Sequence, residues 1–158
     1  MKICIASKNR GKIAELQKLL SEYIKDIEIE LVSLKDVGFT GEIVEDGETF
    51  EENALIKARA ASEFSGLPAI ADDSGLIVNA LNGEPGVYSA RYGFDDSLDD
   101  WGRLLLLLKN TEAVPDGQRQ AQFVCVITMV TPEGQTIQAR GEIHGELLRA
   151  PVGKNGFG

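Results

Sequence analysis

The sequence predicts an α/β fold with a mixed, twisted sheet flanked by helices. Short apolar runs typical of strands alternate with segments in which apolar residues recur at helical spacing. Residues 120–130 and 135–144 are two long strand candidates joined by the turn sequence Thr131-Pro132-Glu133-Gly134, which predicts an antiparallel hairpin. The 158 residues, 43% of them hydrophobic, show no internal repeat and no interdomain linker, so we expect a single domain.

The first elements are expected to be a strand, a loop and a helix. Residues 2–6 are apolar and alternating, and the polar segment 7–12 then leads into a helix with apolar residues at helical spacing as far as Ile24. Residues 27–34 are a second strand candidate. Residues 35–48 are glycine-rich and acidic without helical periodicity, so we expect an exposed loop whose carboxylates are available for chemistry.

The next helix has sequence signals at both of its ends. Thr49 can cap its N-terminus, with Glu52 at capping-box spacing, and Gly66 stops it. Lys57 and Arg59 lie on this helix together with acidic residues. An ion-paired, solvated face is the simplest interpretation of these charges when they are taken alone.

Two short strands, a turn and a further helix should follow. Residues 67–71 and 76–81 are the strand candidates, and Asp72-Asp73-Ser74-Gly75 between them is predicted to turn. Ser97 or Asp99 can cap a helix that continues to Leu108.

The net charge of −9 argues against nucleic acid and anionic membranes as partners. A phosphate ligand needs a local basic patch or a bridging cation, and a nucleotide with Mg²⁺ meets that need. Cys4 and Cys125 each lie in an apolar run, which is typical of reduced core thiols and favours a cytoplasmic location. No stretch approaches the roughly 20 apolar residues that span a bilayer, so we expect a soluble protein.

The segment from Ser7 to Lys12 is a candidate phosphate site. It joins a strand to a helix N-terminus, where free backbone N–H groups and the helix dipole favour an anion. Its side chains add neutral hydrogen bonds from Ser7 and Asn9 and positive charge from Lys8, Arg10 and Lys12. The alternative is a polar helix start with solvated basic side chains.

Carboxylates in two places could hold Mg²⁺. Asp72 and Asp73 are adjacent and can supply one or two oxygens, while phosphates and waters complete the octahedron. One of them could also orient the attacking water. Glu45 or Asp46 could add a ligand from the acidic loop. The alternatives are an Asp-rich turn that satisfies its own backbone and a solvated acidic loop.

The aromatic residues near Arg91 and the single histidine give weaker indications of function. The aromatic residues Tyr88, Tyr92 and Phe94 beside Arg91 could stack a base, although ordinary packing in a half-exposed loop explains them as well. His144 has no nearby nucleophile motif and receives no role.

Taken together, these segments resemble the inosine/xanthosine triphosphate pyrophosphatase family. The resemblance covers essentially the whole chain, and the order of its motifs is more specific than any one of them. The motifs are Ser7-x-Asn9-x-x-Lys12, Gly47-x-Thr49-Phe50-x-Glu52-Asn53-Ala54, Ala71-Asp72-Asp73-Ser74-Gly75-Leu76, Pro85-Gly86-Val87-Tyr88-Ser89-Ala90-Arg91-Tyr92 and Gly156-Phe157-Gly158.

The resemblance implies a long mixed sheet with two lobes around a central nucleotide cleft, a homodimer, and Mg²⁺-dependent hydrolysis of ITP, dITP and XTP to monophosphate and pyrophosphate. By position, Asp73 matches the catalytic, metal-binding aspartate and Glu45 the second metal ligand, while Asp72 supports the metal site. The implied substrate contacts are Ser7, Lys8, Asn9, Arg10, Gly11, Lys12, Lys57, Ser74, Phe157 and Gly158.

Members of that family continue after Phe-Gly with further nucleotide-contacting segments, which are absent after Gly158. We therefore expect the C-terminal part of the domain to be missing, and we assign the activity to the intact protein. Two alternatives stay open: a related pyrophosphatase for other modified nucleotides, and a catalytically inactive fragment that only binds nucleotide.

Overall fold

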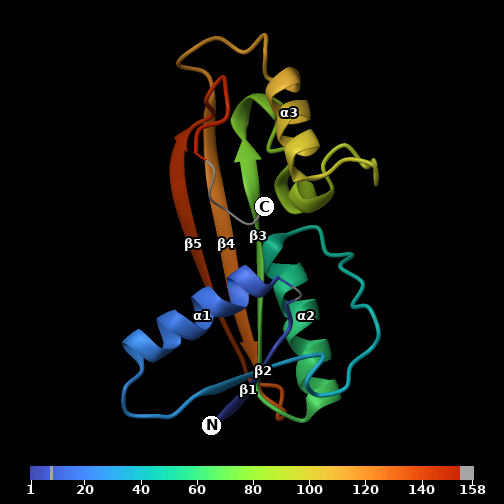
Figure 1. Cartoon of the computed structure of the whole chain (residues 1–158), viewed down its shortest axis with the longest axis vertical. Helices are drawn as coiled ribbons and strands as arrows, with labels where there is room; N and C mark the ends of the chain where they lie inside the picture. Colours follow the sequence, from blue (N-terminus) through green and yellow to red (C-terminus); the bar gives the residue numbers. More distant parts are fainter. Residues whose placement is uncertain (8, 154–158) are drawn as a thin grey trace. The chain divides into compact units, whose positions relative to one another are not determined.

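The computed structural model describes residues 1–7 and 9–153 and contains a five-stranded sheet of order β2-β1-β3-β4-β5 (Figure 1). The elements in chain order are β1 (Lys2–Ile5), α1 (Arg10–Tyr23), β2 (Glu30–Ser33), α2 (Phe50–Ser65), β3 (Ala69–Val78), the 3-10 helices η1 (Asn79–Leu81) and η2 (Gly86–Arg91), α3 (Asp100–Asn110), β4 (Gln120–Val130) and β5 (Thr136–Glu146).

The sheet is mixed, as the sequence predicts. β1 pairs in parallel with β2 and with β3. β4 and β5 are neighbours joined by a short turn, in which the Thr131 N–H donates to the Gln135 carbonyl at 2.9 Å. So short a connection between adjacent strands requires an antiparallel hairpin. Among the described residues, no helix is both long enough and apolar enough to cross a membrane.

The chain forms two compact units. Unit 1 comprises Met1–Asp73 and Val126–Arg140, and unit 2 comprises Ser74–Cys125 and Gly141–Gly158. Strands β3, β4 and β5 each contribute residues to both units.

In unit 1, α2 packs on one face of the strands around β1. Its alanines Ala58 and Ala61 join a buried cluster with Cys4, Ala69 and Ala71. Because successive side chains of a strand point to opposite faces, the odd-numbered residues of β3 face α2 at this end of the strand. The chain order also favours α1 and α2 on opposite faces of the sheet. The connection from β1 to β2 and the connection from β2 to β3 run in opposite directions across the sheet. Both connections join parallel strands, and such crossovers are almost always right-handed.

The helix ends follow the signals in the sequence. The Asn9 side chain caps α1, and Thr49 with Glu52 forms the predicted capping box of α2. Gly66 ends α2 in the left-handed conformation at φ 66°, which glycine adopts without the steric cost of a Cβ. Asp99, one of the two predicted caps, accepts a hydrogen bond from the Gly102 N–H at the start of α3.

Two sequence predictions are wrong. Asp72-Asp73-Ser74-Gly75 does not turn but lies inside the continuous strand β3, because the two carboxylates pair with Lys12 and Lys57 rather than with local N–H groups. Cys125 is exposed rather than buried, because it lies on the outward-facing register of β4, whereas Cys4 is in the core.

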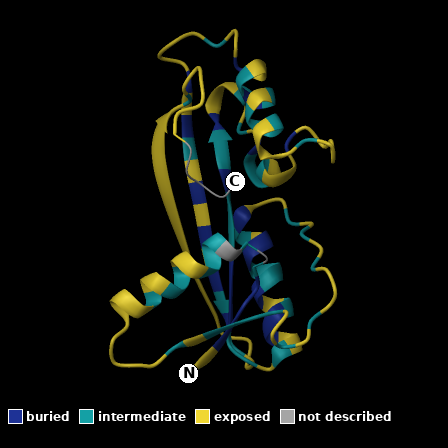
Figure 2. Ribbon diagram, viewed as in Figure 1, coloured by how far each residue is buried: buried dark blue, intermediate teal, exposed yellow. Residues whose placement is uncertain are grey.

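Unit 2 has its own small core, formed by Val78, Tyr92, Leu107 and Ala121. β4 alternates between exposed and buried residues, whereas every residue of the edge strand β5 is exposed, as Figure 2 shows. One guanidinium ties the end of β5 to the segment after α3: buried Arg119 donates to the carbonyls of Leu147 and Thr111.

Candidate active site

The loop between β1 and α1 is held in shape by its own side chains. The Ser7 Oγ accepts a hydrogen bond from the Asn9 N–H at 3.2 Å. Asn9 Oδ1 accepts from the N–H groups of Gly11 and Lys12 at 2.9 and 3.2 Å. These two N–H groups are therefore already capped, so phosphate recognition here falls more on side chains than the sequence suggests. Lys8 and the side chain of Arg10 lie outside the described residues.

Lys12 reaches from the first turns of α1 to β3. Its Nζ lies 2.6 Å from Asp72 Oδ2, and both side chains are partly buried. This contact joins the predicted phosphate loop to the predicted carboxylate pair, which are 60 residues apart in the sequence.

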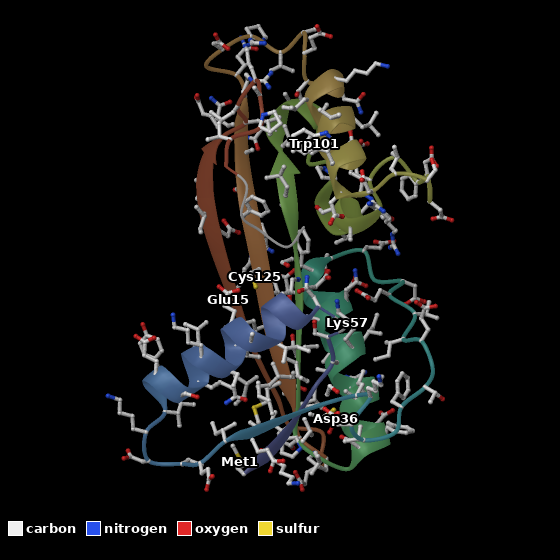
Figure 3. The ribbon with its side chains drawn as sticks, in the orientation of Figure 1. Met1, Glu15, Asp36, Lys57, Trp101 and Cys125 are labelled. Carbon is white, nitrogen blue, oxygen red and sulfur yellow. The ribbon has the colours of Figure 1, made fainter. Side chains whose placement is uncertain are left out.

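A second ion pair network surrounds Lys57, which Figure 3 labels on α2. Lys57 Nζ donates to Glu45 Oε2 at 2.6 Å and to Asp73 Oδ1 at 3.0 Å. The Lys57 side chain is only 13% exposed. Burial alone would lower the pKa of Lys57, but hydrogen bonding to Glu45 and the charges of Asp73 and Glu45 raise it above its ordinary value. Lys57 is therefore firmly cationic, and it is not the solvated helix charge of the simplest interpretation.

Asp73 is the most deeply buried carboxylate of this network. Burial raises the pKa of Asp73, and the opposing charge and hydrogen bond of Lys57 do not fully offset that rise. Its Oδ2 is buried and has no hydrogen-bond partner. A buried carboxylate oxygen without a donor costs free energy unless a cation or a polar ligand meets it, so Asp73 fits the role of a metal ligand.

Asp72 and Asp73 face opposite sides of β3. Asp73 shares the face of Ala69 and Ala71, which α2 covers, whereas Asp72 points to the other face and meets α1. β1 lies between β2 and β3 in the sheet, so its carboxyl end, which leads into the Ser7 to Lys12 loop, is a topological switch point. Such points are where α/β folds bind ligands.

Comparisons with known proteins show the family of this chain. The model of the Ham1 family matches residues 3–158. The chain belongs to the Ham1 family. A dITP/XTP pyrophosphatase of Corynebacterium efficiens is 50% identical over 159 residues, which cover 100% of this chain and 75% of that protein. A dITP/XTP pyrophosphatase of Geobacter sulfurreducens is 44% identical, with 99% of this chain and 76% of that protein covered.

Solved structures of similar proteins share the fold. A Ham1 protein from Coxiella burnetii superposes with a TM-score of 0.88 at 42% identity and covers 100% of this chain and 78% of that one. A nucleoside-triphosphatase, dITP/XTP pyrophosphatase, from Mycobacterium abscessus superposes with a TM-score of 0.84 at 46% identity and covers 100% of this chain and 80% of that one. The predicted family and fold are thus confirmed.

The structure brings together five of the predicted site residues of this Ham1 family member. Lys12 meets Asp72, and Lys57 meets Glu45 and Asp73. Ser74 follows Asp73 on β3, and Phe157 and Gly158 lie outside the described residues. Within the described part of the chain, no three acidic, histidine or cysteine side chains gather in a geometry that could hold a metal.

The aromatic cluster is divided between surface and core. Tyr88 and Phe94 are exposed with ring centroids 5.3 Å apart, and the Arg91 guanidinium lies 5.1 Å from the Tyr88 ring centroid. Tyr92 is instead buried, and its hydroxyl accepts a hydrogen bond from Asn110. Of the three aromatic residues, Tyr92 therefore serves core packing, whereas Tyr88 and Phe94 are exposed.

Sequence reasoning gave no role to Asn53, although its side chain accepts a hydrogen bond from the Gly47 N–H in the loop that carries Glu45. The signals were its place in the motif from Gly47 to Ala54 and its position one helical turn before Lys57, on the same face of α2.

Proposed function

We propose that this protein hydrolyses dITP and XTP to the nucleoside monophosphate and pyrophosphate in the presence of Mg²⁺. The observation that carries the proposal is the buried network in which Lys57 bridges Glu45 and Asp73 while Asp73 Oδ2 has no partner. Relatives that are 44 and 50% identical are dITP/XTP pyrophosphatases, which supports this substrate class. Both units together would form one pyrophosphatase domain.

The lysines supply the positive charge that the reaction needs. The triphosphate is strongly anionic, and the transition state spreads negative charge over the phosphate oxygens. Lys57 remains cationic because Glu45 and Asp73 raise its pKa despite burial. Lys12 reaches the same strand from α1, so the two ammonium groups can flank a triphosphate at β3.

Asp73 would orient the attacking water. Burial raises the pKa of Asp73, which makes it a better proton acceptor than an ordinary solvated aspartate. Water attacks the α-phosphorus, its proton passes to the carboxylate, and the bond to the bridging oxygen of pyrophosphate breaks. The protein thereby separates the phosphate-neutralising role of the lysines from the water-orienting role of Asp73.

Glu45 and Asp73 fit a Mg²⁺ ion. Mg²⁺ commonly binds one or two carboxylates and completes its octahedron with water and substrate phosphates, and these two side chains already converge on Lys57. When bound, the ion would supply further positive charge to the phosphate oxygens. Because Asp72 faces the other side of β3 and pairs with Lys12, we propose that it contributes mainly by orienting that lysine, and a direct metal contact by Asp72 stays a prediction.

The remaining assignments rest on the family resemblance. Ser7, Asn9, Gly11 and Ser74, together with Lys8, Arg10, Phe157 and Gly158, are proposed substrate contacts. The purine 6-oxo group would be selected by hydrogen bonding, because a site built for it leaves its own groups unpaired against a 6-amino group. We further propose a homodimer that acts on free nucleotides in the cytoplasm.

The experiment that tests this function measures pyrophosphate release from dITP, XTP, dGTP and dATP, each with Mg²⁺ and with the metal chelated. We expect release from dITP and XTP only with Mg²⁺, and much slower release from dATP. A preference for a modified pyrimidine or methylated nucleotide would instead favour the related pyrophosphatase. Binding of XTP without release of pyrophosphate would identify a nucleotide-binding protein and contradict the proposal.

A further inference from the structure

Asn53 is a buried polar residue at the start of α2, and it connects the acidic loop to the helix. Only 1% of the surface of Asn53 is exposed to solvent. Asn53 Oδ1 accepts a hydrogen bond from the Gly47 N–H at 2.9 Å. Gly47 lies two residues after Glu45, so this bond fixes the backbone that carries the Glu45 carboxylate.

The contact depends on the absence of a side chain at residue 47. A Cβ on Gly47 would lie 2.7 Å from Asn53 Oδ1 and 2.7 Å from Glu52 Cβ. Neither atom can withdraw easily, because Asn53 is buried and Glu52 belongs to the capping box. Glycine is therefore required here by close approach of the loop to the helix. The Glu52 carboxylate strengthens the same docking, since its Oε2 accepts from the N–H groups of Glu48 and Thr49 at 2.7 and 3.2 Å.

Asn53 also shares a helix with Lys57, whose Nζ donates to Glu45 at 2.6 Å and to Asp73 at 3.0 Å. Asn53 and Lys57 are four residues apart on α2 and thus share one face of the helix. One helical turn therefore carries both the amide that holds the backbone near Glu45 and the ammonium group that meets Glu45 and Asp73.

We propose that Asn53 is a positioning residue that holds Glu45, through Gly47, in place beside Asp73, so that the two carboxylates can share one divalent cation. The residue would act on the reaction only through the placement of Glu45 and would not contact the nucleotide. Its role in turnover rests on the proposed pyrophosphatase function, but its role in metal binding does not. Partners that orient metal ligands in this way commonly matter almost as much as the ligands themselves.

The test compares three single variants with the unmodified protein: Asn53→Ala, Gly47→Ala and the control Ser62→Ala. Ser62 is also a buried polar residue of α2, and its hydroxyl donates to the Leu67 carbonyl at 2.9 Å, away from the network. The affinity for Mn²⁺ without nucleotide is measured by isothermal titration calorimetry. We expect Asn53→Ala and Gly47→Ala each to weaken Mn²⁺ binding by about 10- to 100-fold, and Ser62→Ala to leave it unchanged.

A double variant shows whether the two residues act through one contact. If they do, Asn53→Ala combined with Gly47→Ala should weaken Mn²⁺ binding by little more than either change alone, because residues that share an interaction are not additive. If Asn53→Ala fails to fold by circular dichroism, Gly47→Ala carries the same test from the loop side.

Kinetics provide a readout that a purely structural role would not move. We expect Asn53→Ala to lower kcat for XTP and to raise the Mn²⁺ concentration needed for half-maximal release of pyrophosphate, with KM for XTP nearly unchanged. Equal effects of Asn53→Ala and Ser62→Ala on Mn²⁺ affinity would overturn the proposal. If the unmodified protein releases no pyrophosphate, the proposed function fails, while the Mn²⁺ affinities still decide the role of Asn53.

Discussion

At the scale of single residues, Asp72 and Asp73 illustrate how neighbours in sequence can serve different partners. The sequence presents them as one carboxylate pair. In the structure they project from opposite faces of β3, and each meets a lysine from a different helix. Two adjacent aspartates therefore have different partners: Asp72 contacts Lys12, and Asp73 belongs to the Glu45–Lys57 network.

Replacing each aspartate by asparagine should separate these roles. We expect Asp73→Asn to lower kcat for XTP by at least about 100-fold, because it removes a buried charge from the reaction centre at almost constant volume. We expect Asp72→Asn to act mainly on KM, by roughly tenfold, because weakening a charged hydrogen bond of about 1.5 kcal/mol leaves Lys12 less well oriented.

Steady-state kinetics of pyrophosphate release, with circular dichroism to verify folding, provide the measurement. Near-normal turnover in Asp73→Asn would remove Asp73 from the mechanism. Identical losses of kcat in both variants, with KM unchanged, would instead indicate that both aspartates act on one metal ion.

The sequence selected five charged residues as site candidates, but it did not predict which of them contact one another. Lys12, Glu45, Lys57, Asp72 and Asp73 were all selected from motifs, and the structure brings them into two networks. Which lysine meets which aspartate depends on strand alternation and helix placement. Lys12 and Asp72 are 60 residues apart, and no local pattern encodes that pairing.

At the scale of elements, α2 concentrates stabilising and functional groups at its N-terminal end. Thr49 and Glu52 cap it, and Asn53 and Lys57 project from it toward the site. Its first turn is also tied to β5, where Arg140 Nη1 lies 2.7 Å from Glu51 Oε1. The stability of this helix end and the geometry of the site are therefore linked.

The Glu51–Arg140 pair should make a small, pH-dependent contribution to stability. Hydrogen bonding to Arg140 lowers the pKa of Glu51 in the folded state. The contribution is thus present above the unfolded pKa of about 4.3 and is lost as pH falls through the lower folded pKa. Because both side chains are more than a third exposed, at 35 and 38%, solvent screening limits it to about 0.5 kcal/mol.

We expect Glu51→Gln to lower the free energy of unfolding by that amount at about pH 7 and by progressively less toward about pH 3. Urea denaturation across this range measures the difference, and Glu63→Gln, at an exposed position of the same helix, serves as the control. A loss of stability that stays constant with pH would show that the Glu51 charge is not the cause.

Local signals predicted most elements, and they failed where tertiary contacts override them. Thr49, Glu52 and Gly66 mark the ends of α2 because caps act within one helical turn. Asp72-Asp73-Ser74-Gly75 has the composition of a turn, but partners outside the segment keep it extended in β3. The exposure of Cys125 depends on what covers each face of β4, which a single apolar run does not reveal.

In unit 2, Arg119 should be the most costly arginine to remove. It is buried, and it donates to the carbonyls of Leu147, Thr111 and Leu148 at 2.8, 2.5 and 3.2 Å. Arg119→Met would leave buried acceptors without donors, and we expect it to lower the free energy of unfolding by about 3 kcal/mol.

Arg149 provides a matched comparison, because it also donates to the Val114 and Glu112 carbonyls but is exposed. Urea denaturation of Arg149→Met should show a loss below about 1 kcal/mol. If the two variants lower the free energy of unfolding equally, burial does not explain the contribution of the Arg119 hydrogen bonds to stability.

At the scale of the whole molecule, the net charge of −9 opposes the approach of a nucleoside triphosphate. Two lysines at the site do not reverse this balance, since Lys12 is paired with Asp72 and Lys57 with Glu45 and Asp73. A divalent cation would both neutralise the phosphates and satisfy the buried Oδ2 of Asp73. Nucleotide binding should therefore depend on metal even when no bond is broken.

Thermal unfolding with the non-hydrolysable α,β-methylene analogue of XTP tests this dependence without turnover. With Mg²⁺ and analogue at about 100 times its Kd, binding should stabilise the folded state by about 2.7 kcal/mol and raise Tm accordingly. With the metal chelated, the shift in Tm should largely disappear, and the corresponding ATP analogue should give little shift under either condition. Equal stabilisation by the XTP analogue with and without Mg²⁺ would mean that Lys12 and Lys57 overcome the acidic surface on their own, and that the orphaned Asp73 oxygen serves the bound nucleotide or water rather than a cation.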